Sequence, residues 1–247
     1  MFKNWSLLVV FAAVLYMVLP ADAGWILHEQ DGEKIFISNG KLKGTSEEVN
    51  WIFNGPENEM IFMRADQKIY WRGTADDYCA GSASMMEQML KAVPEEQRKL
   101  MKEMMGKGNQ SSGHKVTIEK DGKGGRIAGF NTVKYLVKVD GELSEEVWLT
   151  TDAAILKEYK PLVPMIQKFH GCLGNSAMGF TLENSAEYQK LWEAGFQLKS
   201  VKHEYGNREV DTDVVKIEKA NIPAKEFQIP AGYQQRSYSE IMQSQME

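Results

Sequence analysis

The sequence predicts a mainly β protein of the α+β class, a curved antiparallel half-barrel whose concave face is covered by helical insertions. Short segments with period-two apolar residues fill most of the chain from Gly24 to Ile229, and Asp-Gly or Asn-Gly pairs typical of tight turns separate many of them. Two helical insertions, each with one apolar face, interrupt the strands and must bury that face against a sheet. A complete up-and-down barrel with peripheral helices is the structural alternative.

Residues 1–23 have the features of a signal peptide. Lys3 precedes an apolar run of thirteen residues, and Ala21-Asp22-Ala23 fits a small-x-small cleavage site. The apolar run is shorter than the ~20 residues that span a bilayer. We therefore expect cleavage after Ala23 and an exported, periplasmic protein whose contact with the membrane is transient at most.

The charge of the chain argues against one class of partner, and its length indicates the number of domains. The formal net charge is −5, and charges of both signs are interspersed, whereas nucleic-acid binding needs clustered Lys and Arg. The length suits a single domain, which we place at residues 24–236, followed by a flexible C-terminal tail at 237–247 with a frayed helix from Ser237.

The first part of that domain, residues 24–73, reads as a meander of short strands. Turn residues occur at Asp31-Gly32, Asn39-Gly40 and Asn54-Gly55-Pro56. Aromatic residues lie along both faces of these strands, which implies that the concave side of the sheet is covered and that the other side is partly covered.

The period changes in the following segment to that of an amphipathic, methionine-rich helix pair at residues 84–105. Ser84 and Glu87 are placed as a capping box, and Pro94 separates the two helices. The expected apolar face consists of Met85, Met86, Met89, Leu90, Val93, Leu100, Met101, Met104 and Met105.

A β-hairpin around Asp140-Gly141 is the clearest local pattern. A two-residue loop would turn the apolar residues of the two strands to opposite faces, so we expect a three-residue connection with Gly141 in the left-handed conformation. Asp152 is placed to cap a following helix, and Pro161 and Pro164 are expected to divide that helix.

The two cysteines, Cys79 and Cys172, form an even set in an exported chain. We expect a disulfide between them, with two buried thiols as the alternative.

No pattern of catalytic or metal-binding residues stands out. The four histidines are scattered, and GNSAMG at Gly174–Gly179 lacks the spacing of a nucleophile elbow. Neighbouring Glu145 and Glu146 point to opposite faces of a strand, so we expect solvated charges and not an acid-base pair. We expect neither an enzyme nor a cofactor.

The methionines of residues 84–105 allow three interpretations. They could line a pliable surface for acyl chains and act as a movable lid over the cavity, or they could simply fill a core. A copper(I) site with thioether ligands is the third interpretation, against which weighs the absence of Met-x-Met and His-Met clusters.

Three segments carry a family resemblance: PEEQRKLMKEMM, then RIAGFNTVKYLVKVDGELSEEVWLTTD, then EFQIPAGYQ. In this order they resemble an uncharacterised family of bacterial exported proteins, known by a domain-of-unknown-function label and similar to the periplasmic lipoprotein carriers (LolA-like). The resemblance implies a half-barrel with a hydrophobic cavity for acyl chains. We therefore expect a carrier for an apolar ligand; the alternative is a structural or interaction protein of the cell envelope, with a filled cavity and a protein partner.

Overall fold

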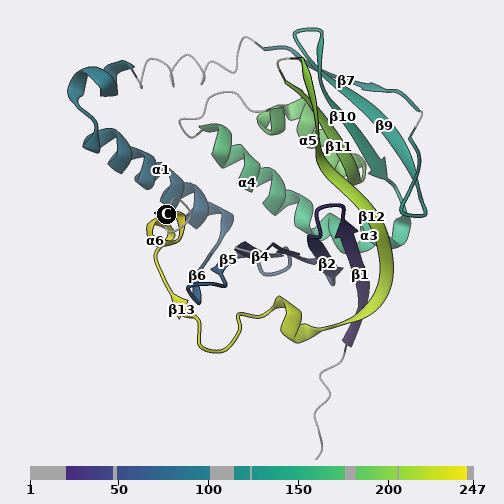
Figure 1. The fold of residues 1–247 in the computed structure, drawn as a ribbon, viewed down its shortest axis with the longest axis horizontal. Helices are drawn as coiled ribbons and strands as arrows, with labels where there is room; N and C mark the ends of the chain where they lie inside the picture. Colours follow the sequence, from purple (N-terminus) through teal and green to yellow (C-terminus); the bar gives the residue numbers. More distant parts are fainter. Residues whose placement is uncertain are drawn as a thin grey trace, which may run out of the picture.

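The computed structural model describes residues 21–46, 49–100, 114–122, 124–175, 182–204 and 206–243 of the 247-residue chain. Most of the expected signal peptide, residues 1–20, lies outside them, as do Met101, Met104 and Met105. The fold is mainly β, with a large open sheet of thirteen strands and several helices (Figure 1).

The first half of the sheet is the expected meander of short strands. Its strands are β1 (Ala21–Glu29), β2 (Lys34–Ser38), β3 (Lys41–Thr45), β4 (Val49–Asn54), β5 (Glu59–Arg64) and β6 (Ile69–Gly73). The Asn39-Gly40 turn is confirmed: both residues have positive φ, 51° and 69°, and Ser38 pairs with Lys41 across it.

The second half follows the helix α1. Its strands are β7 (Val116–Lys120), β8 (Gly125–Ile127), β9 (Phe130–Val139), β10 (Glu142–Thr150), β11 (Phe196–Glu204) and β12 (Asn207–Pro223). The long strand β12 pairs with β11 through its first part and with β1 through its second part, so it joins the two halves. The last short strand, β13 (Gln234–Gln235), adds in parallel to β6.

The sheet does not close in the described part of the chain. Its strand order runs β13-β6-β5-β4-β3-β2-β1-β12-β11-β10-β9-β7, with β8 paired to β9, and the neighbours other than β13 and β6 are antiparallel. The complete barrel is therefore wrong, because the terminal strands β13 and β7 lie at opposite ends of this order.

The hairpin at Asp140-Gly141 corrects one expectation. The turn has two residues, both with positive φ, and Val139 pairs directly with Glu142. A bulge at Ser144 then shifts the register, so that Glu145 pairs with Val137. After the bulge, Val147 and Leu149 share a face with Tyr135 and Val133 as expected, whereas Leu143, which pairs with Lys138, does not. A bulge within β10 and not a longer turn sets this register.

Helix α1 (Ala75–Ala92) begins earlier than expected. Thr74 and Asp77 form the capping box, in which the Thr74 hydroxyl accepts from the Asp77 backbone N–H, so the expected box at Ser84 and Glu87 is wrong. The reason is local, because the same pattern of a hydroxyl residue followed by an acid occurs directly where β6 ends. Residues 95–100 form a second helical segment.

The remaining helices follow the expected signals. Asp152 accepts from the backbone N–H groups of Ala154 and Ile155, and a 3-10 turn containing Pro161 separates the first two of these helices. They are α3 (Ala153–Tyr159), η1 (Lys160–Leu162), α4 (Val163–Asn175), η2 (Leu182–Asn184) and α5 (Ala186–Ala194), with η3 (Ala224–Phe227) and α6 (Tyr238–Gln243) near the C-terminus.

The helices divide the core into separate clusters. The main core lies between the first half of the sheet and α1, α3, α4 and α6 and extends to β11 and β12 of the second half, while a second cluster lies between α5 and strands β7, β9 and β10. A third cluster lies on the outer face of the first half, where Phe227, Ile229 and Tyr233 pack against Ile52 and Ile61. The segment between β12 and β13 therefore crosses the outer face of the sheet (Figure 1).

The C-terminal tail contains the expected helix, which is packed and not frayed. The side chains of Tyr238 and Ile241 of α6 are buried in the main core. The glycine at position 81 of α1 allows this close packing, because a Cβ there would lie 2.7 Å from the Tyr238 ring. Residues 244–247 lie outside the described part.

None of the helices in the described ranges is long and apolar enough to cross a membrane.

Candidate functional site

A row of aromatic side chains crosses the helix-covered face of the first half of the sheet. Strand pairing places Trp51 of β4 beside Phe62 of β5, and Phe62 beside Trp71 of β6. Gly44 of β3 lies opposite Trp51, where a Cβ would come within 2.3 Å of the indole. Glycine at this position thus lets the Trp51 ring lie flat on the neighbouring strand.

The helices add rings to this row. Tyr78 of α1 lies 5.7 Å from Phe62 and 4.7 Å from Phe169 of α4, measured between ring centroids. Tyr238 of α6 lies 5.1 Å from Tyr78. We call the set the aromatic cluster; it consists of Trp51, Phe53, Phe62, Trp71, Tyr78, Phe169 and Tyr238.

Burial divides the cluster into two parts. Phe53, Trp71, Tyr78 and Tyr238 are buried. Trp51, Phe62 and Phe169 are only partly buried, although they lie among those rings; we call these three the aromatic patch. Desolvation raises the pKa of Tyr78, and a hydrogen bond with Tyr238 adds to this effect, so its phenol remains neutral. The site is therefore apolar and uncharged.

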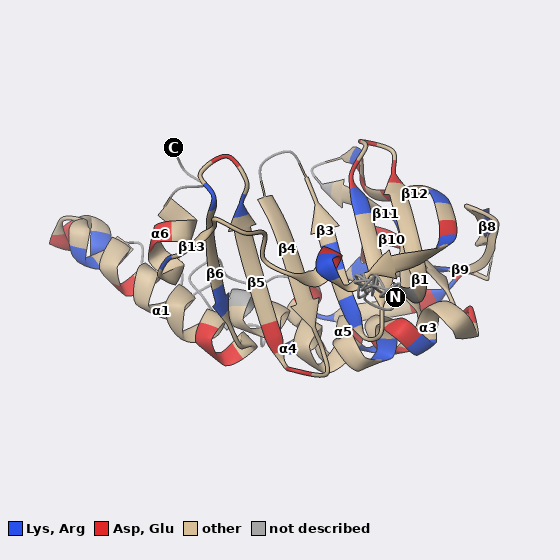
Figure 2. Cartoon of the chain, turned by 90° about the horizontal axis from the view of Figure 1, so that it is seen from below, with Lys and Arg blue, Asp and Glu red and all other residues tan. Residues whose placement is uncertain are grey.

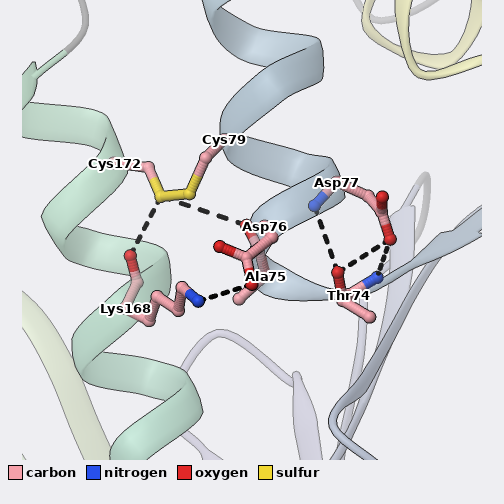
Figure 3. The surroundings of a disulfide bond; sticks show 7 residues. All are labelled: Thr74, Ala75, Asp76, Asp77, Cys79, Lys168 and Cys172. Carbon is pink, nitrogen blue, oxygen red and sulfur yellow. Dashed lines mark hydrogen bonds and ion pairs between the residues drawn. A yellow bond between two sulfur atoms is a disulfide. The ribbon is translucent and has the colours of Figure 1, made fainter.

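The disulfide Cys79–Cys172 joins α1 to α4 next to this cluster (Figure 3). The two Cα atoms are 5.2 Å apart, which confirms the expected bridge. Lys168 of α4 also forms an ion pair with Asp76 of α1, with 2.5 Å between Nζ and Oδ2.

The residues expected to form a methionine lid lie in different surroundings. Met85 packs against the main core and Leu90 is buried, whereas Met86 and Val93 are half-buried. Met89 is 45% exposed and Leu100 is 59% exposed. In Figures 1 and 2 the second half of α1 extends beyond β6 and β13, so it projects past the sheet instead of lying over it.

Three carboxylates near the β1–β2 turn could offer oxygen ligands to a cation. The side-chain oxygens of Glu29, Asp31 and Glu33 lie within 4.8 Å of one another. Burial, together with the neighbouring carboxylates, raises the pKa of Glu29 to about 7. The carboxylates repel one another, and either a proton on Glu29 or a bound cation would reduce this repulsion.

A second carboxyl group lies in the cluster beneath α5. Glu145 of β10 is 1% exposed, and its Oε2 accepts from the Tyr188 hydroxyl at 2.9 Å. Burial raises the pKa of Glu145 to about 7, although the hydrogen bond from Tyr188 acts in the opposite direction. The expectation of a solvated role for Glu145 is therefore wrong, because the bulge at Ser144 turns this side chain to the covered face.

Two cavities lie at strand turns, away from the aromatic cluster. One, of about 640 Å³, is lined by Asp31, Gly32, Glu33, Lys34, Thr45, Ser46 and Val49. The other, of about 400 Å³, is lined by His114, Val139, Asp140, Glu142, Leu143, Ser144 and His203. Neither includes an expected lid residue or a ring of the cluster.

The aromatic patch was not singled out from the sequence. The period-two pattern and the tight Asn39-Gly40 turn do fix which residues of β2 and β3 share a face, and extending this register would have placed Trp51 and Phe62 together. The contribution of Phe169 depends on how α4 docks on the sheet, which no local pattern indicates.

Comparison with known proteins places the chain in a family. A search of curated proteins finds no match. Residues 83–233, from the middle of α1 to the segment before β13, match a family model described as Domain of unknown function (DUF4412). The chain therefore belongs to the DUF4412 family.

Proposed function

We propose that the chain is a non-enzymatic, exported binding protein that holds an apolar ligand, such as a lipid or another acyl compound, against the aromatic patch. One observation supports this above the others. Trp51, Phe62 and Phe169 stay partly exposed on a face whose neighbouring rings are buried. The open, helix-covered sheet is consistent with a half-barrel, and a LolA-like carrier fold is part of the proposal.

The energetics of the patch suit an apolar ligand. Each methylene group removed from water contributes about 0.8 kcal/mol. The rings are held by further rings behind them, such as Phe53 and Trp71, so little side-chain freedom is lost on binding. Lys168 of α4 is paired with Asp76, so its charge is already partly neutralised and the proposed ligand is recognised by its apolar part.

An interaction protein of the envelope is the second candidate, and α6 favours it. Tyr238 and Ile241 enter the same core from the C-terminal end and fill part of the face. In this case the rings would serve only as a packed interior, and a protein partner would bind elsewhere.

Ligand binding by the full chain separates the two candidates. The protein, purified from its own source, is analysed by native mass spectrometry and lipid extraction, and is then titrated with a fluorescent palmitate probe. We expect a co-purifying apolar compound and saturable binding of the probe. Absence of both would exclude the carrier and leave the interaction protein.

A matched pair of variants tests the location of the site. Phe62→Ser places a hydroxyl in the patch and should weaken probe binding about tenfold, or ~1.4 kcal/mol. Phe36→Ser is the control, because Phe36 of β2 is also half-buried but points to the opposite face, where Lys43 lies over its ring. Equal binding by both variants, with their far-ultraviolet circular dichroism unchanged, would place the ligand somewhere else.

Export has a separate test. The N-terminus of the protein from its own source should be Gly24, because cleavage is expected after Ala23. Strand β1 begins at Ala21, and the pairing of Gly24 with Ala220 and the following pairs remain after this cleavage. Intact mass spectrometry that finds Met1 retained would contradict export.

A further inference from the structure

The contacts that fix α1 to the rest of the molecule are concentrated in its first two turns. They involve the capping box of Thr74 and Asp77, the ion pair from Asp76 to Lys168, the ring of Tyr78, the disulfide of Cys79 and the close contact of Gly81 with Tyr238.

The rest of the helix is held much less. Beyond Gly81, Met85 packs against the main core, whereas Met89 is exposed and the pair of Glu87 with Lys91, 2.6 Å apart, lies within α1 itself. Helix α1 is thus attached mainly at one end, beside strand β6, whereas its other end extends past the sheet, with Leu90 still buried (Figure 1).

The disulfide lies at this attached end and next to the rings that cover the patch. Cys79 directly follows Tyr78, and Cys172 lies one helical turn after Phe169; these two rings are in contact, at 4.7 Å. Figure 3 shows the bridge between the two helices. Both cysteines are only partly buried, so a thiol reagent in solution can reach them.

We propose that Cys79–Cys172 is a redox latch of the ligand site. The intact bond holds the first turns of α1 against α4 over Phe62 and Phe169, and its reduction lets α1 swing about its junction with β6 and opens the aromatic patch for ligand exchange. This inference rests on the proposed function, because it concerns the access of a ligand to that site.

The chemistry of the latch is thiol–disulfide exchange with a dithiol as the reductant. A thiolate of the dithiol attacks one sulfur, forming a mixed disulfide and releasing the other cysteine as a thiolate. The second thiol of the reductant then displaces the remaining cysteine. Two electrons pass to the protein, both cysteines end as thiols with protons from the dithiol, and the reductant leaves as a cyclic disulfide.

The bond is suited to this role because it is the covalent link between the two helices, beside the contact of the Tyr78 and Phe169 rings. The ion pair of Lys168 with Asp76 is exposed and contributes weakly in water. Strands β9 and β10 lie in the second half of the sheet, and the backbone pairing between them does not involve the bridge. Reduction should therefore loosen α1 without unfolding the sheet.

Two measurements on the full chain test the latch. Dissociation of a fluorescent palmitate probe is followed by stopped flow, and amide hydrogen exchange is followed by mass spectrometry, before and after reduction with dithiothreitol. We expect about tenfold faster dissociation of the probe after reduction, since most changes in affinity at one site fall on the dissociation rate. Exchange should rise in residues 75–92 and stay unchanged in β9 and β10. The double variant Cys79→Ser/Cys172→Ser should reproduce the reduced protein and no longer respond to dithiothreitol.

The outcomes separate the latch from the proposed function. Unchanged exchange in residues 75–92 after reduction overturns the latch, and so does an equal rise throughout the sheet, which would make the bond a general structural support. Unchanged dissociation of the probe overturns control of ligand exchange. If the oxidised protein binds no probe, the proposed function fails, while the exchange result still decides whether the bond holds α1.

Discussion

The two halves of the sheet cover their inner faces in different ways. In the first half, helices from three places in the sequence lie over the aromatic cluster, and part of that cluster remains accessible. In the second half, the single helix α5 lies over a small cluster that fully buries the carboxyl group of Glu145.

The outer faces differ as well. The outer face of the first half is covered by Phe227, Ile229 and Tyr233, whereas that of the second half carries cross-strand ion pairs, such as Lys134 with Glu146 at 2.9 Å and Lys138 with Glu119 at 2.7 Å. The first half therefore has an apolar cluster on each face, although its outer face also carries the ion pair of Lys43 with Glu226. This difference supports the proposal that an apolar ligand binds to the first half.

A substitution in helix α6 should cause the largest loss of stability in the first half. Tyr238→Ala removes a ring that lies between Trp71, Tyr78 and Gly81, and should lower the free energy of unfolding by about 3–4 kcal/mol. Tyr233→Ala, on the partly buried outer face, is the control and should cost about half as much. Urea unfolding measures both. Equal losses would mean that α6 does not close the main core.

The carboxyl group of Glu145 tests the second half. Because its pKa is raised to about 7 in the folded protein, Glu145 keeps its proton there while the unfolded chain, with a pKa near 4.5, already ionises. Stability should therefore be highest below pH ~4.5 as far as this group is concerned, should fall as the pH rises toward 7, and should stay reduced above it.

Replacing this carboxyl group isolates its contribution. Glu145→Gln keeps the shape and a hydrogen-bond partner for Tyr188 but cannot ionise, so it should stabilise the protein by about 2–3 kcal/mol at pH 8 and have little effect at pH 4. The pKa of Glu29, at the end of β1 in the first half, is also raised to about 7. The same change in stability, measured for Glu29→Gln, therefore serves as the comparison. An equal gain from Glu145→Gln at both pH values would show that ionisation is not the cause.

The sequence allowed the type of fold to be predicted because its evidence is local. The period-two strands, the Asn39-Gly40 turn and the cap at Asp152 each need only a few neighbouring residues, and all were confirmed. The wrong details depend on longer range. The bulge at Ser144 is set by the cluster that the strand must face, and a complete barrel could not be excluded without knowing which terminal strands meet.

The candidate site was less accessible to prediction for the same reason. The disulfide could be expected from the number of cysteines alone, but the aromatic patch needs the docking of α4 on β4 and β5. The methionines drew attention to residues 84–105, whereas the structure takes much of that segment away from the sheet (Figure 2). Helical periodicity identifies an apolar face without showing what lies opposite it.

Substitutions of two glycines should change the free energy of unfolding by smaller amounts and test how Trp51 packs in the first half. Gly44→Ala would push a Cβ to 2.3 Å from the Trp51 indole, so the ring must move and unfolding should become easier by about 1–2 kcal/mol. Gly171→Ala in α4 meets nothing within 4 Å outside its own helix and should stabilise by about 0.5–1 kcal/mol. Trp fluorescence should shift only in the first variant. A gain in both would mean that the Trp51 ring is not held against β3.

The ion pairs on the outer face of the second half should matter least. Lys138→Gln breaks the pair with Glu119, whose side chain is largely exposed, and should change the free energy of unfolding by less than about 1 kcal/mol. Salt should reduce even this difference, because screening acts strongly on exposed charges. Thermal unfolding at low and high salt checks both statements. A larger, salt-independent loss would mean that the charged face packs as firmly as the apolar one, and the contrast between the two halves would then lie only in their chemistry and not in their contribution to stability.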